Sequence, residues 1–310
     1  SNRMNVWATL VTVLLSWNLT IQVFYHLPQI LLQENDVQTK VTLGDQRLEE
    51  GKLIPRKIDN NSWGVKISAQ SAAVMDKNTG LVLWQKNADQ VRSLASITKL
   101  MTVLVFLDHN PGWDKIVTME QADETSELKP NILRGENVTV RDLFNIALVA
   151  SDNNAARALA RSTGLSMEDF VKAMNAKTIE LKMNQSNFVE PTGLDAQNQA
   201  TALDVLKMAK AAFAKQEIQK AVVQKSYGLL TQEGRNQKVL STNNLLKSYL
   251  NVKAGKTGYI EAAGYCLIVE VANDEGQEIL TVVLGSSAHE NRFQDAKILS
   301  GWVFENYQWL

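Results

Sequence analysis

Residues 95–105 read ASITKLMTVLV and place two polar side chains, Ser96 and Lys99, at the start of an apolar run. The apolar residues that follow have the i, i+3, i+4, i+7 spacing of a buried helix face: Leu100, Val103, Leu104 and Leu107. The spacing predicts a buried helix that begins close to Ser96. Because Ser96 and Lys99 are three residues apart, their side chains share one face. A serine hydroxyl is a poor nucleophile without a base, and a lysine kept neutral by burial can accept its proton.

The segments on both sides of this helix predict strands. The turn Asn78-Thr79-Gly80 separates SAAVMD from LVLWQKN, which predicts a β-hairpin over about residues 72–87. The runs YCLIVEV and EILTVVLG flank the turn NDEG and predict a second hairpin, followed by a final helix around residues 289–304. Helices with polar caps at Thr139, Ser166 and Thr201 are among those predicted between the hairpins, at residues 140–149, 154–161, 167–181 and 202–214. Strands at both ends with helices between them predict one α/β domain whose sheet collects distant segments.

The first 33 residues predict a membrane anchor or an uncleaved signal. No charged residue occurs from Met4 to Gln33, and the apolar stretch 6–25 has about the length that crosses a bilayer as a helix. A cleaved signal peptide and an amphipathic segment lying on the protein are the alternatives. Arg3 precedes the stretch and acidic residues follow it, which favours a body outside the cytoplasm. Residues 34–65 are polar and charge-mixed, so we expect a tether there and a catalytic domain over residues 66–310.

Composition excludes several classes of function. The 310 residues include 32 basic and 33 acidic ones, so the chain lacks the basic excess that is typical of nucleic-acid binding. A single cysteine, Cys266, excludes an internal disulfide and a cysteine-based zinc site. The three histidines are far apart and form no HExxH motif. We therefore expect neither a metal nor a cofactor, and a nucleophile that uses a base other than histidine.

Two further strings follow Ser96-Ile97-Thr98-Lys99 along the chain. Ser151-Asp152-Asn153 separates two predicted helices, and such connections often carry functional groups. Lys256-Thr257-Gly258 opens the second strand region, where the glycine would let a substrate backbone approach the sheet and the lysine and threonine could grip a carboxylate. Each string alone is weak evidence, because short patterns of this kind also occur by chance.

Two apparent motifs do not fit. The string Gly255-Lys256-Thr257 resembles the end of a phosphate-binding loop, but Leu250 stands where that loop requires its first glycine. Glu180 and Asn184 match the E-x-x-x-N of a class A β-lactamase. They continue an amphipathic helix, so a solvated helix face is the favoured interpretation.

With all three motifs in the same order, the sequence resembles the serine D-alanyl-D-alanine carboxypeptidases, the low-molecular-weight penicillin-binding proteins of the peptidase S11 type. The flanking blocks agree over about residues 66–308; they are ASITKLMTVLV, ALVASDNNAARALA, FVEPTGLD and GKTGYIEAAGYCL. The resemblance implies a β-lactamase/transpeptidase-like α/β fold, an antiparallel sheet flanked by helices with an all-helical subdomain.

The resemblance also implies a role for each motif residue. Ser96 would be the acylated nucleophile, Lys99 its general base, and Ser151 a proton relay to the leaving amine. The substrate-binding residues would be Asn153 for an amide, and Lys256, Thr257 and Gly258 around the terminal carboxylate. The backbone N–H groups of Ser96 and Tyr259 would form the oxyanion hole.

The activity expected from the resemblance is removal of the terminal D-alanine from peptidoglycan stem peptides through an acyl-enzyme, with β-lactams as inhibitors. A DD-endopeptidase or a β-lactamase on the same fold is the alternative within enzymes, and a silent wall-binding membrane protein is the alternative outside them. The expected location is the bacterial cell envelope, with the catalytic domain outside the cytoplasm and an N-terminal helix in the membrane.

Other residues favour structural roles. Cys266 lies in an apolar strand, and Trp302 and Phe304 lie in the last helix, so all three are predicted to be core residues. Asp152 is a candidate helix cap. The turn Pro191-Thr192-Gly193 is predicted to shape one wall of the site.

Overall fold

The computed structural model describes residues 53–125 and 130–310. Its contacts group residues 50–310 into one compact unit, distinct from residues 1–49. The predicted anchor (1–33) and residues 34–52 of the predicted tether lie outside the described residues. Within the described ranges, no helix combines the length and the apolar character that crossing a bilayer requires.

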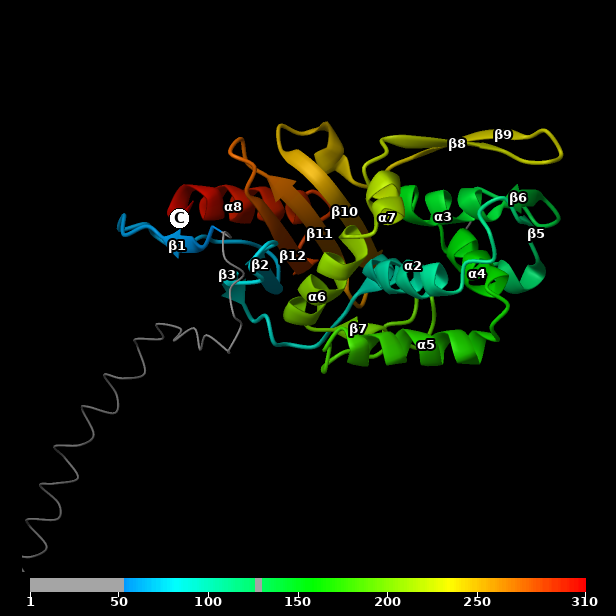
Figure 1. The fold of residues 1–310 in the computed structure, drawn as a ribbon, viewed down its shortest axis with the longest axis horizontal. Coiled ribbons are helices and arrows are strands. Elements are labelled where there is room, and N and C mark those ends of the chain that lie inside the picture. Colours follow the sequence, from blue (N-terminus) through cyan, green and yellow to red (C-terminus); the bar gives the residue numbers. More distant parts are fainter. Residues whose placement is uncertain (1–52, 126–129) are drawn as a thin grey trace, which may run out of the picture. The chain divides into compact units, whose positions relative to one another are not determined.

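A five-stranded antiparallel sheet runs through the unit in the order β10-β11-β12-β2-β3 (Figure 1). Its strands are β2 (Ser71–Asp76), β3 (Val82–Lys86), β10 (Asn251–Ile260), β11 (Gly264–Ala272) and β12 (Glu278–Ser286). Both predicted hairpins are confirmed, since β2 pairs with β3 and β11 with β12. Pairing of β12 with β2 joins the two hairpins into one sheet. Strands β2, β11 and β12 are buried along most of their length, which explains their nearly continuous apolar runs.

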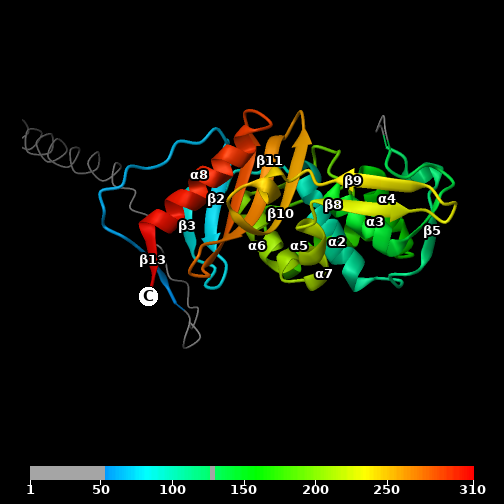
Figure 2. The same cartoon turned by 90° about the horizontal axis from the view of Figure 1, so that it is seen from above.

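Helices cover both faces of the sheet (Figures 1 and 2). Helix α8 (Asn291–Asn306) packs on one face, where Phe293 and Leu299 share a core with Val269 and Val283. On the other face Ile268 and Val282 belong to a larger core that includes helices α2 (Lys99–Asp108) and α6 (Ala202–Phe213). Successive strand residues point to opposite faces, so one strand supplies both cores. The antiparallel sheet flanked by helices is confirmed.

The helices of the second half of the fold match their predicted ranges closely. They are α3 (Val140–Val149), α4 (Asn153–Ser162), α5 (Met167–Glu180) and α6, and the shorter helix α7 (Gln216–Val222) follows them. The side chains of Thr139, Ser166 and Thr201 each accept a hydrogen bond from the backbone N–H three residues later, so all three predicted caps are confirmed. Together with α2 these helices form the predicted helical part.

Helix α7 and the hairpin of β8 (Ser226–Leu230) and β9 (Asn236–Leu240) are among the elements that were not predicted from the sequence. Helix α7 is only seven residues long and has no side-chain cap. The hairpin of β8 and β9 buries only Leu229 and Val239, too few residues for a clear alternating pattern. The remaining short elements are β4 (Arg92–Ser93) with β7 (Gln199–Ala200), β5 (Ile116–Thr118) with β6 (Asn137–Thr139), and the 3₁₀ turns η1 (Ala95–Thr98), η2 (Gln121–Asp123) and η3 (Asn244–Lys247).

The folded unit begins earlier than the predicted boundary at residue 66. Strand β1 (Pro55–Lys57) pairs with β13 (Tyr307–Trp309) at the end of the chain. The indole N–H of Trp302 also donates to Ser62 Oγ at 3.2 Å. The described part of the predicted tether is therefore attached to the domain, because backbone pairing compensates for its lack of an apolar pattern.

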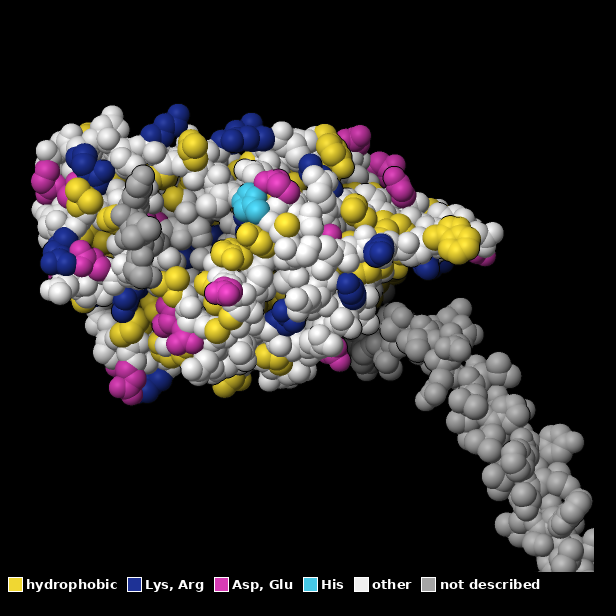
Figure 3. Space-filling view, turned by 180° about the vertical axis from the view of Figure 1, so that it is seen from behind, with side chains coloured by type: hydrophobic (Ala, Val, Ile, Leu, Met, Phe, Trp, Pro, Cys, Tyr) yellow, Lys and Arg dark blue, Asp and Glu magenta, His cyan; other side chains and the backbone are white. Residues whose placement is uncertain are grey.

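Charged side chains of both signs alternate over one face of the molecule. On the face that Figure 3 shows, Lys and Arg side chains are interspersed with Asp and Glu, and hydrophobic side chains form small separate groups. This distribution agrees with the near-zero net charge of the sequence.

Candidate active site

Ser96 and Lys99 form the first half of the site. Ser96 lies in η1, directly after Ala95, which has a left-handed backbone with φ of 48°. Lys99 is the first residue of α2 and is fully buried. Its Nζ lies 2.9 Å from Ser96 Oγ, 2.6 Å from Asn153 Oδ1 and 2.8 Å from the carbonyl oxygen of Thr192. The amine is thus held in hydrogen-bond contact with the partly exposed serine hydroxyl.

Ser151 and Lys256 form the second half. Helix α3 ends before Ser151, whose φ of 62° is unusual for a residue other than glycine. Lys256 Nζ donates to Ser151 Oγ at 2.7 Å and to the carbonyl oxygen of Thr257, the next residue, at 2.9 Å. Backbone conformations of this kind cost about 1–3 kcal/mol and cluster at functional sites.

Asp152 sets the position of Asn153. Its side chain caps α4 by accepting a hydrogen bond from Ala155 N at 2.7 Å, so the predicted cap is confirmed. Asn131 donates to the second oxygen of the same carboxylate at 2.8 Å. Asn153 is consequently the first residue of α4, where its amide oxygen reaches Lys99.

Lys256 is a buried lysine in a positive environment. It lies on β10, the edge strand of the sheet, and is 1% exposed. Burial lowers its pKa well below the ordinary value, and the charges of Lys99 and Arg292 lower the pKa further. No carboxylate among the described residues forms an ion pair with it. The site therefore favours an anionic group from a ligand.

Two glycines let the backbone segments of the site approach one another. A Cβ on Gly258 would lie 2.8 Å from the carbonyl oxygen of Leu94 and 3.0 Å from Ser96 N. A Cβ on Gly193 would lie 1.9 Å from the carbonyl oxygen of Ala95, and Gly193 has a φ of 88°. Strand β10 and the turn at 191–193 therefore pack directly on the backbone that carries Ser96, and this turn does form a wall of the site.

Glu190 and Asn198 support that wall; no role was predicted for either residue, although Glu190 lies in the flanking block FVEPTGLD. The carboxylate of Glu190 accepts hydrogen bonds from Thr192 N at 2.7 Å and from Thr192 Oγ1 at 2.6 Å. The amide of Asn198 donates to the same carboxylate at 2.6 Å. These contacts orient the turn whose carbonyl at Thr192 accepts from Lys99.

Arg292 is a further residue that sequence reasoning missed, because it lies on α8 without a recognisable motif. Its guanidinium is buried and donates to the carbonyl oxygen of Gly258 at 3.1 Å. It also lies over the rings of Tyr265 and Phe293, 5.5 and 4.8 Å from their centroids. Burial lowers the pKa of Arg292. Its charge fixes the end of the Lys256-Thr257-Gly258 segment and adds to the positive field.

The structure brings the predicted site residues together from four elements. Lys99 contacts both Ser96 and Asn153, and Lys256 contacts Ser151. Thr257 continues along β10 and shares a hydrogen bond of 2.6 Å with Thr242 Oγ1. The side chain of Tyr259 is exposed and stacks on Tyr265 with ring centroids 4.2 Å apart, so only its backbone remains a candidate for the site. Among the described residues, no cluster of three or more His, Cys, Asp or Glu side chains could hold a metal ion.

The remaining predictions concern residues outside the cleft. Cys266 is fully buried on β11, as predicted. Trp302 and Phe304 are only partly buried at the edge of the core under α8. Glu180 lies exposed at the end of α5 and pairs with Lys177, which agrees with a solvated helix face.

Comparison with known proteins agrees with this geometry. The family model of D-alanyl-D-alanine carboxypeptidases, Peptidase S11, matches residues 57–288. The D-alanyl-D-alanine endopeptidase of Pseudomonas aeruginosa is 34% identical over 255 residues, which cover 77% of this chain and 78% of that protein. The D-alanyl-D-alanine carboxypeptidase DacF of Bacillus subtilis is 32% identical over 77% of this chain and 63% of its own.

Solved structures share the fold. The DD-transpeptidase of Streptomyces K15 superposes with a TM-score of 0.73 at 28% identity, over 79% of this chain and all of that one. The D-alanyl-D-alanine carboxypeptidase of Mycobacterium tuberculosis H37Rv has a TM-score of 0.74 at 26% identity, over 81% of this chain and 96% of that one. The β-lactamase/transpeptidase-like fold class is confirmed. The chain belongs to the peptidase S11 family of serine-type D-alanyl-D-alanine carboxypeptidases.

Proposed function

We propose that the protein removes the terminal D-alanine from peptidoglycan stem peptides through an acyl-enzyme on Ser96. The observation that carries this proposal is the pair of short contacts that connect Lys99 with Ser96 and Lys256 with Ser151. A nucleophile within hydrogen-bond reach of a base is the arrangement that acyl transfer requires. A second hydroxyl on a second lysine provides a path for the proton to the leaving amine.

In the acylation step, the unprotonated amine of Lys99 accepts the proton of Ser96 as Oγ attacks the carbonyl carbon of the penultimate D-alanine. The bond to the terminal D-alanine then breaks, and the proton that Lys99 accepted is returned to the leaving amine through the Ser151 hydroxyl, which gives up one proton and takes up another, so that Lys99 is again an unprotonated amine. Asn153 holds the substrate amide. Water later attacks the ester and releases the shortened peptide, which restores Ser96.

The terminal carboxylate binds to Lys256 and Thr257. Burial lowers the pKa of Lys256, the positive charge of Arg292 lowers it further, and a carboxylate bound there would favour the charged form of Lys256. Charge-assisted hydrogen bonds are shorter and stronger than neutral ones, so the carboxylate distinguishes a chain end from an internal peptide bond.

The oxyanion of the tetrahedral intermediate accepts hydrogen bonds from the backbone N–H groups of Ser96 and Tyr259. The approach of Gly258 to Ser96 supports this assignment, because it brings the two segments into contact. Removing one donor of an oxyanion hole costs about 2.7–4 kcal/mol of transition-state stabilisation. Both donors are backbone groups, so the side chain at position 259 is free to vary.

Endopeptidase activity on cross-linked peptides is the second candidate function. Similar proteins from Pseudomonas aeruginosa and from Escherichia coli are D-alanyl-D-alanine endopeptidases, at 34% and 32% identity. The chemistry at Ser96 would be the same, with a peptide side-chain amine as the leaving group. β-Lactams would acylate the same serine. β-Lactamase activity is less well supported, since Glu180 lies exposed and paired with Lys177.

The cell envelope is the proposed location, with the stretch 6–25 as a helical anchor that holds the domain outside the cytoplasm. The apolar length of that stretch supports the proposal. Sedimentation of the full chain with membranes, compared with a chain that begins at residue 50, tests it. Equal sedimentation of both chains would contradict an anchor. The shorter chain begins at residue 50 rather than 66 because β1 belongs to the folded unit.

Release of D-alanine from a pentapeptide ending in D-Ala-D-Ala tests the main function. We expect release by the wild type, none by Ser96→Ala, and acylation of the wild type alone by a labelled penicillin. Cleavage of a cross-linked dimer without D-alanine release would establish the endopeptidase instead. Rapid turnover of penicillin would indicate a β-lactamase, and no acylation at all would contradict a serine peptidase.

A further inference from the structure

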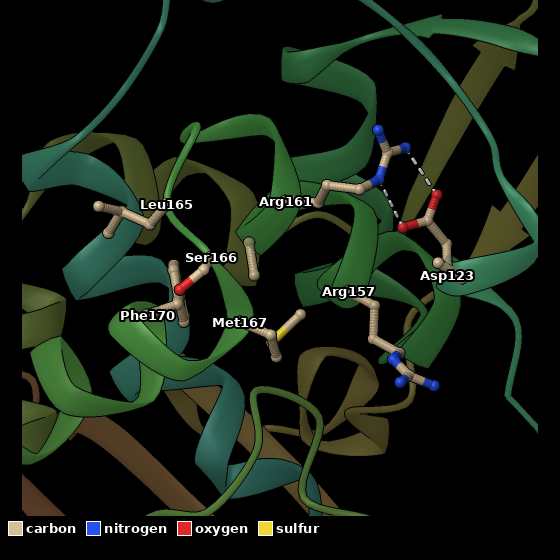
Figure 4. Close-up of a pocket in the computed structure, with 9 residues that line it drawn as sticks. Asp123, Arg157, Arg161, Leu165, Ser166, Met167 and Phe170 are labelled. Carbon is tan, nitrogen blue, oxygen red and sulfur yellow. Dashed lines mark hydrogen bonds and ion pairs between the residues drawn. The ribbon is translucent and has the colours of Figure 1, made fainter.

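A cavity of about 320 Å³ lies between α4, α5 and η2, and none of its lining residues belongs to the candidate active site. Two arginines of α4, Arg157 and Arg161, line the cavity. Figure 4 shows that their side chains lie separate from those of Leu165, Met167 and Phe170. Phe170 is buried, and Met167 is 38% exposed at the rim. A volume of this size accommodates a small organic group, and an apolar lining with few polar groups is typical of a binding pocket.

The two arginines differ in their partners. Arg161 donates to both carboxylate oxygens of the buried Asp123, at 2.9 and 2.7 Å, and also contacts Glu120. Arg157 donates one hydrogen bond, to the carbonyl oxygen of Glu124 at 3.0 Å, and forms no ion pair with any described residue. In Figure 4 its guanidinium lies away from the Asp123–Arg161 pair. The remaining N–H donors of Arg157 suit a carboxylate, which guanidinium binds in a bidentate geometry.

Helix α4 connects this cavity with the active site. Asn153, Arg157, Ala160 and Arg161 are at positions i, i+4, i+7 and i+8, so they lie along one face of the helix. Four residues of an α-helix span about 6 Å. Asn153 contacts Lys99 in the candidate active site. Arg157 therefore lies about one helical turn from that site along α4, and the cavity that it lines extends toward the C-terminal end of the helix.

We propose that Arg157 and this cavity form a subsite for the part of the peptide substrate remote from the scissile bond. Arg157 binds a carboxylate located about two residues before the D-Ala-D-Ala end, and the apolar lining receives the small aliphatic residue before it. This inference rests on the proposed function, because that function places the substrate amide on Asn153. The order of groups along such a peptide matches the order of their partners along α4.

Calorimetric binding of two peptides to the Ser96→Ala chain tests the subsite without requiring turnover. Ala-γ-D-Glu-Lys-D-Ala-D-Ala carries the remote carboxylate, whereas diacetyl-Lys-D-Ala-D-Ala lacks it. Arg157→Gln added to Ser96→Ala should weaken binding of the pentapeptide about tenfold and leave the tripeptide unchanged. Arg141→Gln, at an arginine on α3 whose side chain is 52% exposed, is the matched control and should change neither.

A second variant covers the case in which Arg157→Gln does not fold. Met167→Glu places a negative charge at the exposed rim and should weaken the same peptide selectively. Equal weakening of both peptides, or no weakening of either, would overturn the subsite. Failure of the proposed function is a different result: the wild type would then release no D-alanine from either peptide and penicillin would not acylate Ser96, while the two peptides could still be compared for binding.

Discussion

Two lysines near the central sheet, Lys256 and Lys77, have pKa values shifted in opposite directions. Burial on its own lowers the pKa of each lysine, and the other neighbours decide the direction of the overall shift. Lys77, next to β2, donates to Glu270 at 2.7 Å and to Glu278 at 2.9 Å, and these carboxylates raise its pKa above the ordinary value. Within the part of the chain that the structure describes, Lys256 donates only to a hydroxyl and a carbonyl oxygen, so burial and nearby cations lower its pKa without a carboxylate to oppose them.

The difference teaches that the partner, and not burial alone, decides what a buried lysine can do. A lysine between two carboxylates remains an ammonium and serves the structure. A lysine among cations and neutral oxygens exchanges its proton more readily and attracts an anionic ligand. The carboxylates of Glu270 and Glu278 beside Lys77 thus distinguish this structural lysine from Lys256, a lysine of the candidate site.

Between the two lysines, substitution of Lys256 by Met is expected to have the larger effect on activity. The variant loses the cation that we propose binds the terminal carboxylate, so kcat/KM on peptides ending in D-Ala-D-Ala should fall about 10²- to 10³-fold. Steady-state D-alanine release measures this. An equal loss on an ester substrate without the carboxylate would remove that role from Lys256.

The same variant should stabilise the fold. Because the folded pKa of Lys256 is below the ordinary 10.5, the unfolded chain binds more protons between that lowered pKa and 10.5, and stability falls as the pH falls through this window. Lys256→Met removes the penalty and should raise the free energy of unfolding by about 1 kcal/mol at neutral pH. Urea unfolding at several pH values, with Lys66→Met as an exposed control, measures it. A less stable variant would contradict the comparison.

Gly193→Ala tests whether close backbone packing positions Ser96 beside Lys99. The added Cβ would lie 1.9 Å from the carbonyl oxygen of Ala95, so the segment carrying Ser96 must move. A displacement of about 1 Å can cost 10²-fold in rate, and we expect that loss in penicillin acylation. Gly164→Ala is the matched control, because Gly164 also has a positive φ but a Cβ there meets no atom within 4 Å. Equal acylation of both variants would contradict the close approach.

Lys77→Met should reduce stability and leave acylation unchanged. It removes the cation from Glu270, a fully buried carboxylate whose pKa burial already raises. The expected loss is about 2 kcal/mol at neutral pH, discounted because Lys77 is partly exposed. The loss should shrink as the pH falls through the raised pKa of Glu270, since protonation removes the buried charge. The double variant Lys77→Met/Glu270→Gln should recover most of the stability. No recovery would show that the unpaired carboxylate of Glu270 is not the cause of the loss.

Cys266 gives the smallest expected effect. It lies opposite Gly258 on β11, with Arg92 and Arg292 nearby, and burial nevertheless raises the pKa of its thiol to about 11. The native protein should therefore resist a thiol reagent at pH 8, whereas the chain unfolded in urea should react fully. Rapid labelling of the native protein would show that nearby cations outweigh burial here.

Much of the fold could be predicted from local patterns. The hairpin of β2 and β3, the four capped or periodic helices and the last helix came from apolar spacing and turn residues, which act over a few residues. The hairpin of β8 and β9 was missed because it buries only two apolar side chains, Leu229 and Val239. The early start of the domain was missed because β1 depends on pairing with β13, far away in the sequence.

The sequence by itself determined the types and order of the groups at the site: Ser96 and Lys99, Ser151 and Asn153, then Lys256. Their spacing within each motif is local, so it can be identified in the sequence. Only the tertiary structure decided that Lys256 has no carboxylate partner among the described residues, that Arg292 and Glu190 support the site, and that Arg157 lines a cavity. Partners, burial and electrostatic fields depend on contacts between segments far apart along the chain, and such contacts exist only after the sheet and helices have packed.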